Sequence, residues 1–92
     1  MNLQQTATEL ARKYGLNTPV MARYVDLVAE VGEIGKELLV GSDYGAKDIE
    51  ATGDMVKEMG DVVFSLALLA SSLDLDLEEC LQQNHRKISN AV

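Results

Sequence analysis

EVGEIGKELL (residues 30–39) and EMGDVVFSLALLA (residues 58–70) are the two segments that decide the fold of this chain of 92 residues. Each segment begins with two acidic residues three positions apart: Glu30 and Glu33 in one, Glu58 and Asp61 in the other. Residues three positions apart lie on the same side of an α-helix, so the carboxylates of each pair point the same way. Both pairs belong to segments with helical apolar spacing, which predicts two long helices that carry acidic clusters.

Four carboxylates that converge repel one another and are costly to remove from water. A divalent cation neutralises such a cluster, and hard cations prefer oxygen ligands. We therefore expect an Mg²⁺ site, with Mn²⁺ as a possible substitute, held by Glu30, Glu33, Glu58 and Asp61. The alternative is that the acidic residues of the second helix form its solvated face, to which we assign Lys36 and Glu37.

Composition and charge describe a single small domain, residues 1–92. One cysteine, Cys80, excludes an internal disulfide and fits the reducing cytoplasm, and the first residues do not resemble a signal peptide. A net charge of −7 argues against duplex nucleic acid or an anionic membrane as a partner. The densest apolar stretch, residues 62–70, is too short to span a bilayer. A phosphate substrate is compatible with this charge if metal ions accompany it.

Four helical segments are predicted and no strand pattern competes with them, so the fold class is all-α. The expected helices run from about Leu3 to Tyr14, from about Pro19 to Val40, from between Asp48 and Asp54 to near Leu73, and onward from Asp76. The expected N-caps are Asn2, Thr18 and Asp76, with Gly15 and Gly41 as stops.

The second helix carries two parallel stripes. Its apolar stripe, expected to face the core, is Val20, Tyr24, Leu27, Val31, Ile34 and Leu38. Its polar stripe is Arg23, Asp26, Glu30, Glu33 and Glu37. Two long helices with two shorter ones predict a four-helix bundle-like subunit. The third helix is apolar nearly all round between Met59 and Leu69, so we expect a second subunit to bury part of it, in a homo-dimer or tetramer.

The last helix places Asn84 on its inner stripe and Lys87 on the adjoining face. Together they could present an amide and an ammonium group to a phosphate; alternatively, both are solvated groups of a terminal helix. The chain has no Glu-x-x-His pair for a di-iron bundle, and no glycine-rich phosphate loop, HExxH or GxSxG motif.

The paired motif Glu30-x-x-Glu33 and Glu58-x-x-Asp61 resembles the signature of the MazG-like all-alpha nucleoside triphosphate pyrophosphohydrolases. The resemblance extends from about Leu27 to Lys87 and includes a late Asn-x-x-Lys, here Asn84 and Lys87. It implies hydrolysis of a nucleoside triphosphate between the α and β phosphates, giving a monophosphate and pyrophosphate, with nucleotide-pool house-cleaning as the expected role.

The resemblance also implies roles for the residues that match the motif. The four acidic residues would hold Mg²⁺, and Glu33 or Glu30 would be the catalytic group that orients or deprotonates water. Asn84 and Lys87 would bind phosphate oxygens, and an apolar cleft near Tyr24 or Phe64 would hold the base. Two alternatives remain: an enzyme like phosphoribosyl-ATP pyrophosphatase, which shares the fold, and a non-enzymatic acidic helical oligomer that acts as a binding or regulatory module.

Overall fold

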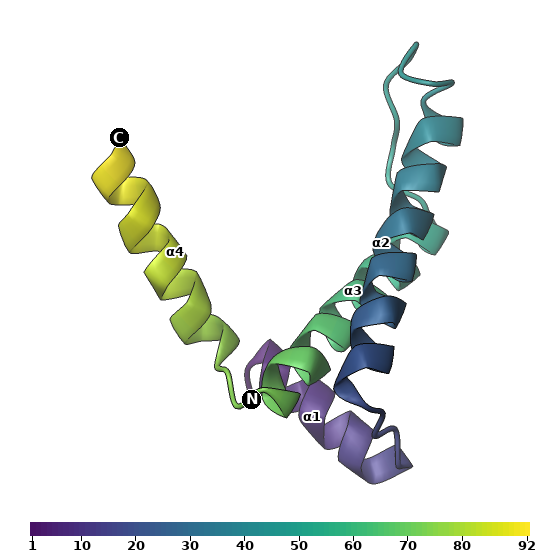
Figure 1. Cartoon of the computed structure of the whole chain (residues 1–92). Helices are drawn as coiled ribbons and strands as arrows, with labels where there is room; N and C mark the ends of the chain where they lie inside the picture. Colours follow the sequence, from purple (N-terminus) through teal and green to yellow (C-terminus); the bar gives the residue numbers. More distant parts are fainter.

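The computed structural model describes all 92 residues and contains four α-helices and no strand (Figure 1). The helices are α1 (Leu3–Tyr14), α2 (Val20–Gly41), α3 (Gly53–Ser72) and α4 (Leu77–Ala91). The prediction of an all-α chain with these four segments is confirmed. None of the four helices combines the length and the apolar character needed to cross a bilayer.

Capping residues explain where three of the helices begin. In α1 the Asn2 side chain accepts from the Gln5 amide at 2.8 Å, and Gln5 accepts in return from the Asn2 amide at 2.9 Å. Asp76 caps α4 through the Glu78 amide at 2.9 Å, and Thr52 caps α3. The prediction of Thr18 as the cap of α2 is wrong, because Pro19 occupies that position and no side chain caps this helix.

The residues of α2 that face α3 are spaced alternately three and four positions apart in the sequence. Its buried and half-buried residues are Val20, Arg23, Leu27, Glu30, Ile34 and Glu37, and all other residues of α2 are exposed. The matching residues of α3, with the same alternation, are Met55, Glu58, Val62, Ser65 and Leu69. This spacing is typical of long helices that lie nearly side by side. We call the contact between these two sets of residues the α2/α3 seam.

The apolar stripe predicted for the second helix is therefore wrong at three of its six positions. Tyr24, Val31 and Leu38 are 50%, 51% and 43% exposed. An arginine and two glutamates from the predicted polar stripe lie in the seam instead, because they stand seven residues apart. A seven-residue interval spans nearly two helical turns and returns a side chain to the same packed face.

Small side chains allow α1 to approach α3 closely. The buried residues of α1 are Ala7 and Ala11, and α3, against which α1 packs, buries Ala67 and Ala70. Ala67 has no exposed surface. Since an alanine interface leaves no room for longer side chains, this contact fixes the position of α1.

The fourth helix stands apart from the other three (Figure 1). α3 packs against both α1 and α2, whereas α4 has no comparable contact with any helix and no buried residue. The radius of gyration is 15.6 Å, against about 12 Å for a compact domain of this length. Only α1, α2 and α3 pack together within one chain. The predicted four-helix bundle-like packing is therefore not formed by a single chain, because α4 lies apart.

Enlarging Ala67 should destabilise the fold. Ala67→Leu adds three carbon atoms where α1 meets α3, and overpacking of this kind costs about 1–3 kcal/mol of unfolding free energy. Urea titration followed by circular dichroism measures the loss. The matched control is Ala22→Leu on the exposed face of α2, which should change stability by less than about 0.5 kcal/mol. Equal effects of the two substitutions would contradict the close α1–α3 contact.

Candidate functional site

Three glutamates lie half-buried in the α2/α3 seam, where apolar residues would be expected. Glu30 and Glu37 come from α2 and Glu58 from α3. Each has one carboxylate oxygen, Oε2, that is shielded from solvent and has no hydrogen-bond partner. Buried carboxylate oxygens are normally paired, so three unpartnered ones in a single seam make this seam the candidate functional site.

The electrostatics of Glu30 reflect this crowding. Partial burial raises the pKa of Glu30 above its ordinary value of 4.5, and the charges of Asp61 and Asp26 raise it further. The guanidinium of Arg23 opposes the shift but does not cancel it. Asp61, on α3, thus lies within electrostatic reach of Glu30, on α2, as the sequence predicted.

Glu58 is crowded in the same way from the other helix. Desolvation is the largest cause that raises the pKa of Glu58, followed by the side chain of Glu37, with which it can share a proton. The charges of Glu37, Glu33 and Asp54 raise that pKa further. The two predicted acidic motifs therefore do meet across the seam, and Glu37 meets them too.

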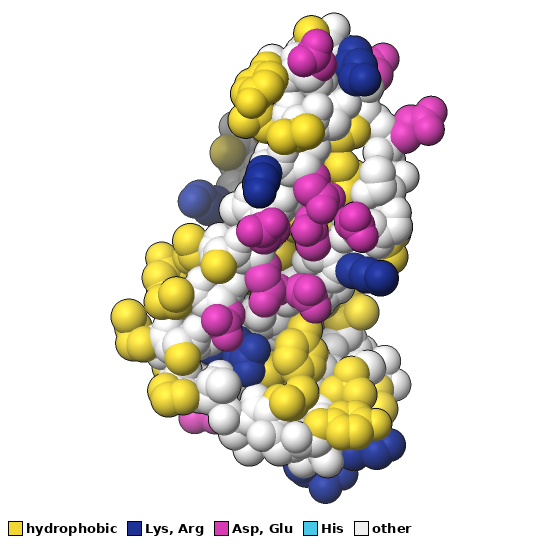
Figure 2. All heavy atoms as spheres, turned by 90° about the vertical axis from the view of Figure 1, so that its right-hand side faces the viewer, with side chains coloured by type: hydrophobic (Ala, Val, Ile, Leu, Met, Phe, Trp, Pro, Cys, Tyr) yellow, Lys and Arg dark blue, Asp and Glu magenta, His cyan; other side chains and the backbone are white.

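The four predicted metal ligands differ in their burial. Glu30 and Glu58 point into the seam, whereas Glu33 and Asp61 are exposed at its edge. All four belong to one electrostatic group, but no three acidic side chains stand in a metal-ligating arrangement. Figure 2 shows the resulting cluster of acidic side chains in the middle of one face, with apolar patches beside it.

The assignment of Glu37 to the solvated face is wrong. Glu37 is half-buried, carries an unpartnered oxygen and approaches Glu58. The signal that could have identified it is its place seven residues after Glu30, which itself lies seven after Arg23. Residues on one line of a packed helix share the same neighbour, so a buried Glu30 implies a buried Glu37.

Arg23 is the basic residue that the seam buries. It is 8% exposed, and its guanidinium donates to the Leu16 carbonyl at 3.1 Å. Its Cζ lies 5.6 Å from the centre of the Phe64 ring, within the range of a cation–π contact. Phe64 is half-buried and Tyr24 is exposed. Neither residue lines the hollow beside the acidic cluster, where the base was expected near one of them.

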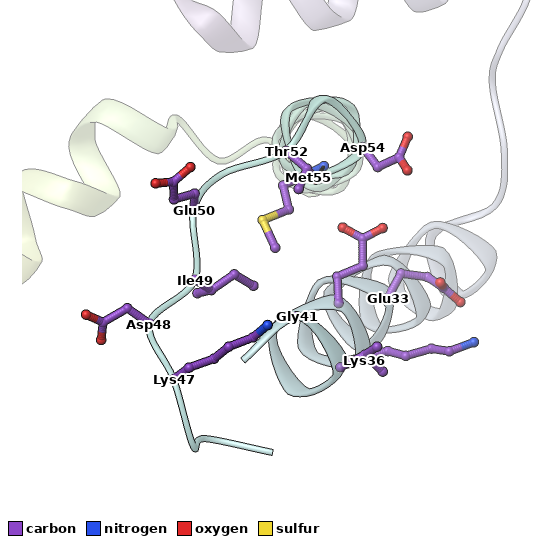
Figure 3. A pocket seen from close by; sticks show the side chains of 12 residues that line it. Glu33, Lys36, Gly41, Lys47, Asp48, Ile49, Glu50, Thr52, Asp54 and Met55 are labelled. Carbon is purple, nitrogen blue, oxygen red and sulfur yellow. Dashed lines mark hydrogen bonds between the residues drawn. The ribbon is translucent and has the colours of Figure 1, made fainter. Parts of the chain in front are cut away.

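A hollow of about 620 Å³ opens beside the cluster, between the end of α2, the following loop and the start of α3 (Figure 3). Its apolar side consists of Val40, Ile49 and Met55. Glu33 and Glu37 border it on the side of the seam. Lys47 extends from the loop toward the end of α2. A concave apolar wall with a few polar side chains is the usual surface of a small-molecule site.

Asn84 and Lys87 do not reach this cluster within one chain. Both are exposed on α4, which diverges from α2 and α3 (Figure 1). No residue of α4 lines the hollow beside the acidic residues. The structure thus gathers the carboxylates that the sequence singled out but leaves the predicted phosphate-binding pair apart from them.

Comparison with known families identifies this arrangement. The family model described as MazG nucleotide pyrophosphohydrolase domain matches residues 21–91, which include both acidic motifs and all of α3. The chain belongs to the MazG family. The predicted resemblance is confirmed on this point.

The chain is also similar to a bacterial protein over most of its length. The chain is 44% identical over 70 residues to a protein of Bacillus subtilis (strain 168) named "Uncharacterized protein YpjD", and the match covers 73% of this chain. The chain spans 60% of the length of that relative. No solved structure matches the chain.

The donor set of this MazG domain fits a hard divalent cation. The shielded oxygens of Glu30, Glu37 and Glu58 lack partners, and Glu33 and Asp61 stand at the edge of the same cluster. All of these donors are carboxylate oxygens, the ligands that Mg²⁺ and Mn²⁺ prefer.

The raised pKa values make metal-free stability depend on pH. Folded Glu30 and Glu58 keep their protons above the ordinary value of 4.5, at which the unfolded chain releases them. Unfolding free energy must therefore fall as pH rises from that value through the raised pKa values. Thermal melts in EDTA between about pH 5 and about pH 8 should show this decline.

The matched variants isolate the cause of this pH dependence. Glu58→Gln removes one titrating group and should flatten the decline, whereas Glu50→Gln, in the exposed loop, should leave it unchanged. A slope that is identical in the two variants would show that the seam glutamates do not produce it.

Proposed function

We propose that this chain is an Mg²⁺-dependent nucleoside triphosphate pyrophosphohydrolase that cleaves between the α and β phosphates, releasing a monophosphate and pyrophosphate. The observation that carries the proposal is the set of three unpartnered glutamate oxygens in the α2/α3 seam of a MazG-family chain. An activity in nucleotide-pool house-cleaning, in the cytoplasm, fits this chemistry.

Charge explains why a metal is needed. A triphosphate brings about four negative charges to a surface that is already acidic, so cations must bridge the two. Within the chain, Arg12 and Glu9 form the one ion pair, and it lies on α1. No lysine or arginine therefore neutralises the cluster by direct pairing.

The acidic residues have distinct proposed roles. Glu30, Glu33, Glu58 and Asp61 would hold the cation, and we add Glu37 because it faces Glu58. Bound Mg²⁺ would neutralise the charge that develops on the phosphate oxygens. The oxygen of water bonds to one of the two phosphorus atoms as the bond from that phosphorus to the bridging oxygen breaks, so that pyrophosphate and monophosphate separate, and the proton of the water passes to Glu30 or Glu33.

We place the nucleoside in the hollow beside Glu33 and Glu37. Its volume of about 620 Å³ lies within the ordinary range for small-molecule sites. Ile49 and Met55 offer an apolar surface against which a base can stack. This position replaces the predicted cleft near Tyr24 or Phe64, neither of which lines the hollow.

We further propose that the active form is a homo-oligomer, a dimer or tetramer. The chain buries only eight residues, and on α3 Val56, Met59, Val63 and Leu66 are all at least 40% exposed. Exposed apolar side chains on this scale mark an interaction surface. Sedimentation equilibrium at micromolar concentration tests the proposal, and an active species at the monomer mass of 10.0 kDa would refute it.

Release of pyrophosphate from a panel of nucleotides tests the activity directly. With Mg²⁺, at least one ribo- or deoxyribonucleoside triphosphate should yield its monophosphate and pyrophosphate, and EDTA should abolish the reaction. The panel includes phosphoribosyl-ATP, since preferential cleavage of that compound would support the alternative enzyme. A folded protein that cleaves no member of the panel would favour the non-enzymatic binding module.

Binding of Mg²⁺ should stabilise the fold independently of catalysis. A cation that binds only the native state raises the melting temperature by mass action, so millimolar Mg²⁺ should raise it above the value in EDTA. Glu37→Gln and Glu58→Gln should both reduce this shift, whereas Glu50→Gln should not. A shift that survives Glu37→Gln unchanged would remove Glu37 from the site.

Substitutions that remove the charge of a carboxylate but keep its shape should distinguish residues needed for turnover from acidic residues that are not. Glu33→Gln and Asp61→Asn keep the side-chain shape and should each lower turnover by at least ~100-fold, since each removes charge from the metal site. Asp43→Asn, in the exposed loop after α2, is the matched control and should retain activity. Equal losses at all three positions would contradict the assignment.

A further inference from the structure

A second hollow, of about 330 Å³, lies at the end of the subunit where α1 ends, α2 begins and α3 ends (Figure 1). None of the residues that line it is acidic, although acidic residues outnumber basic ones in the chain by 15 to 8. Two of the basic residues, Arg12 and Arg23, line it. No residue lines both this hollow and the one beside the acidic cluster. We call it the α1/α2 hollow.

Arg23 brings unused hydrogen-bond donors to this hollow. Its guanidinium donates to the carbonyl of Leu16, which also lines the hollow, so the charged end of the side chain lies at the hollow. That bond occupies one of the five N–H groups of a guanidinium. The others make no hydrogen bond or ion pair within the chain, and none of the guanidinium nitrogens is sealed from solvent without a partner. Since Arg23 is only 8% exposed, and buried arginines are normally paired, these free donors indicate a place for an anion.

The start of α2 adds backbone donors to the same place. No side chain caps this helix, and its first three amides, residues 20–22, have no acceptor. The amides of Asn17 and Thr18, which both line the hollow, also have none. Free N–H groups at a helix N-terminus favour a bound anion, because the helix dipole is positive there. An anion in the α1/α2 hollow would supply the cap that α2 lacks.

The hydroxyl groups of the hollow are already in use. Thr8 and Ser72 line it, and their hydroxyls donate to the carbonyls of Gln4 and Leu68 at 2.9 and 2.8 Å. The donors that remain for a ligand are therefore those of the two arginines and of the chain that leads into α2.

We propose that the α1/α2 hollow binds a phosphate group, held by Arg23 and Arg12 at the uncapped start of α2. The planar guanidinium of arginine matches two phosphate oxygens at once. The hollow has room for inorganic phosphate, or for the phosphate end of pyrophosphate or a nucleoside monophosphate. Between Met55 in the first hollow and Leu68 in this one, α3 runs for about 20 Å. The α1/α2 hollow is thus a second site, and its existence does not depend on the proposed function.

Titration with phosphate in EDTA tests the site without any enzyme assay. In the absence of divalent cations the acidic cluster repels anions, so saturable binding reports a basic site. In an amide NMR spectrum, phosphate should shift the signals of residues 17–23 and 71–72 far more than those of residues 58–61. Sodium chloride of the same ionic strength is the matched salt control. Inorganic phosphate, pyrophosphate and a nucleoside monophosphate are titrated separately, and the tightest binder identifies the source of the phosphate group.

Four variants locate the binding. Arg23→Lys keeps the charge but loses the two-oxygen geometry, so it should weaken phosphate binding about tenfold. Arg12→Gln, at an exposed position, should weaken it about threefold. Glu9→Gln should tighten it, because Glu9 forms an ion pair with Arg12. Arg86→Gln, on exposed α4, is the matched control and should leave the affinity unchanged. The three exposed variants decide the matter even if Arg23→Lys does not fold.

Three results would overturn the proposal. The first is the absence of saturable binding of all three phosphate probes, and the second is a set of signal shifts centred on Arg86 and Lys87. The third is an equal affinity in Arg12→Gln, Glu9→Gln and Arg86→Gln. A protein that binds phosphate in the α1/α2 hollow but cleaves no nucleotide would instead retain this site and reject the proposed function.

Discussion

The mutual repulsion of carboxylates in the α2/α3 seam is the constraint on which the rest of this structure depends. Glu30, Glu37 and Glu58 occupy positions that apolar residues fill in an ordinary pair of packed helices, and each keeps a shielded oxygen without a partner. Burial and neighbouring charge raise the pKa values of Glu30 and Glu58, so packing these helices works against ionisation. A divalent cation bound there would remove that conflict and would link folding of the seam to the proposed chemistry.

Because charged residues occupy much of the α2/α3 seam, the subunit has only a small apolar core. Its buried apolar residues are four alanines, one methionine and one leucine, and larger apolar side chains remain exposed along α2, α3 and α4. For a chain this small the hydrophobic contribution to stability is correspondingly limited. In the proposed oligomer, other copies of the chain would cover these surfaces.

Much of this could be predicted from the sequence, because local signals decided it. Capping residues and helical spacing located the four helices, and the paired acidic motifs located Glu30 and Glu58 on facing helices. The predictions that were wrong concern which surface each helix packs against, and the sequence of one helix alone does not determine this. A polar residue such as Glu37 is expected to face solvent, whereas the seven-residue spacing from Glu30 places Glu37 in the seam. The position of α4 could not be predicted, since it depends on hydrogen bonds from Gln4, more than 70 residues away in the sequence.

Paramagnetic relaxation by Mn²⁺ tests the central claim most directly, because it locates the bound cation without requiring turnover. In an amide NMR spectrum of the assembled protein, substoichiometric Mn²⁺ should broaden first the signals of residues 30–37 and 58–61, and excess Mg²⁺ should restore them. Acidic residues elsewhere, such as Asp43 and Glu50 of the exposed loop, should broaden only at higher Mn²⁺. Uniform broadening at all acidic residues, with no preference for the seam, would contradict a metal site formed by α2 and α3.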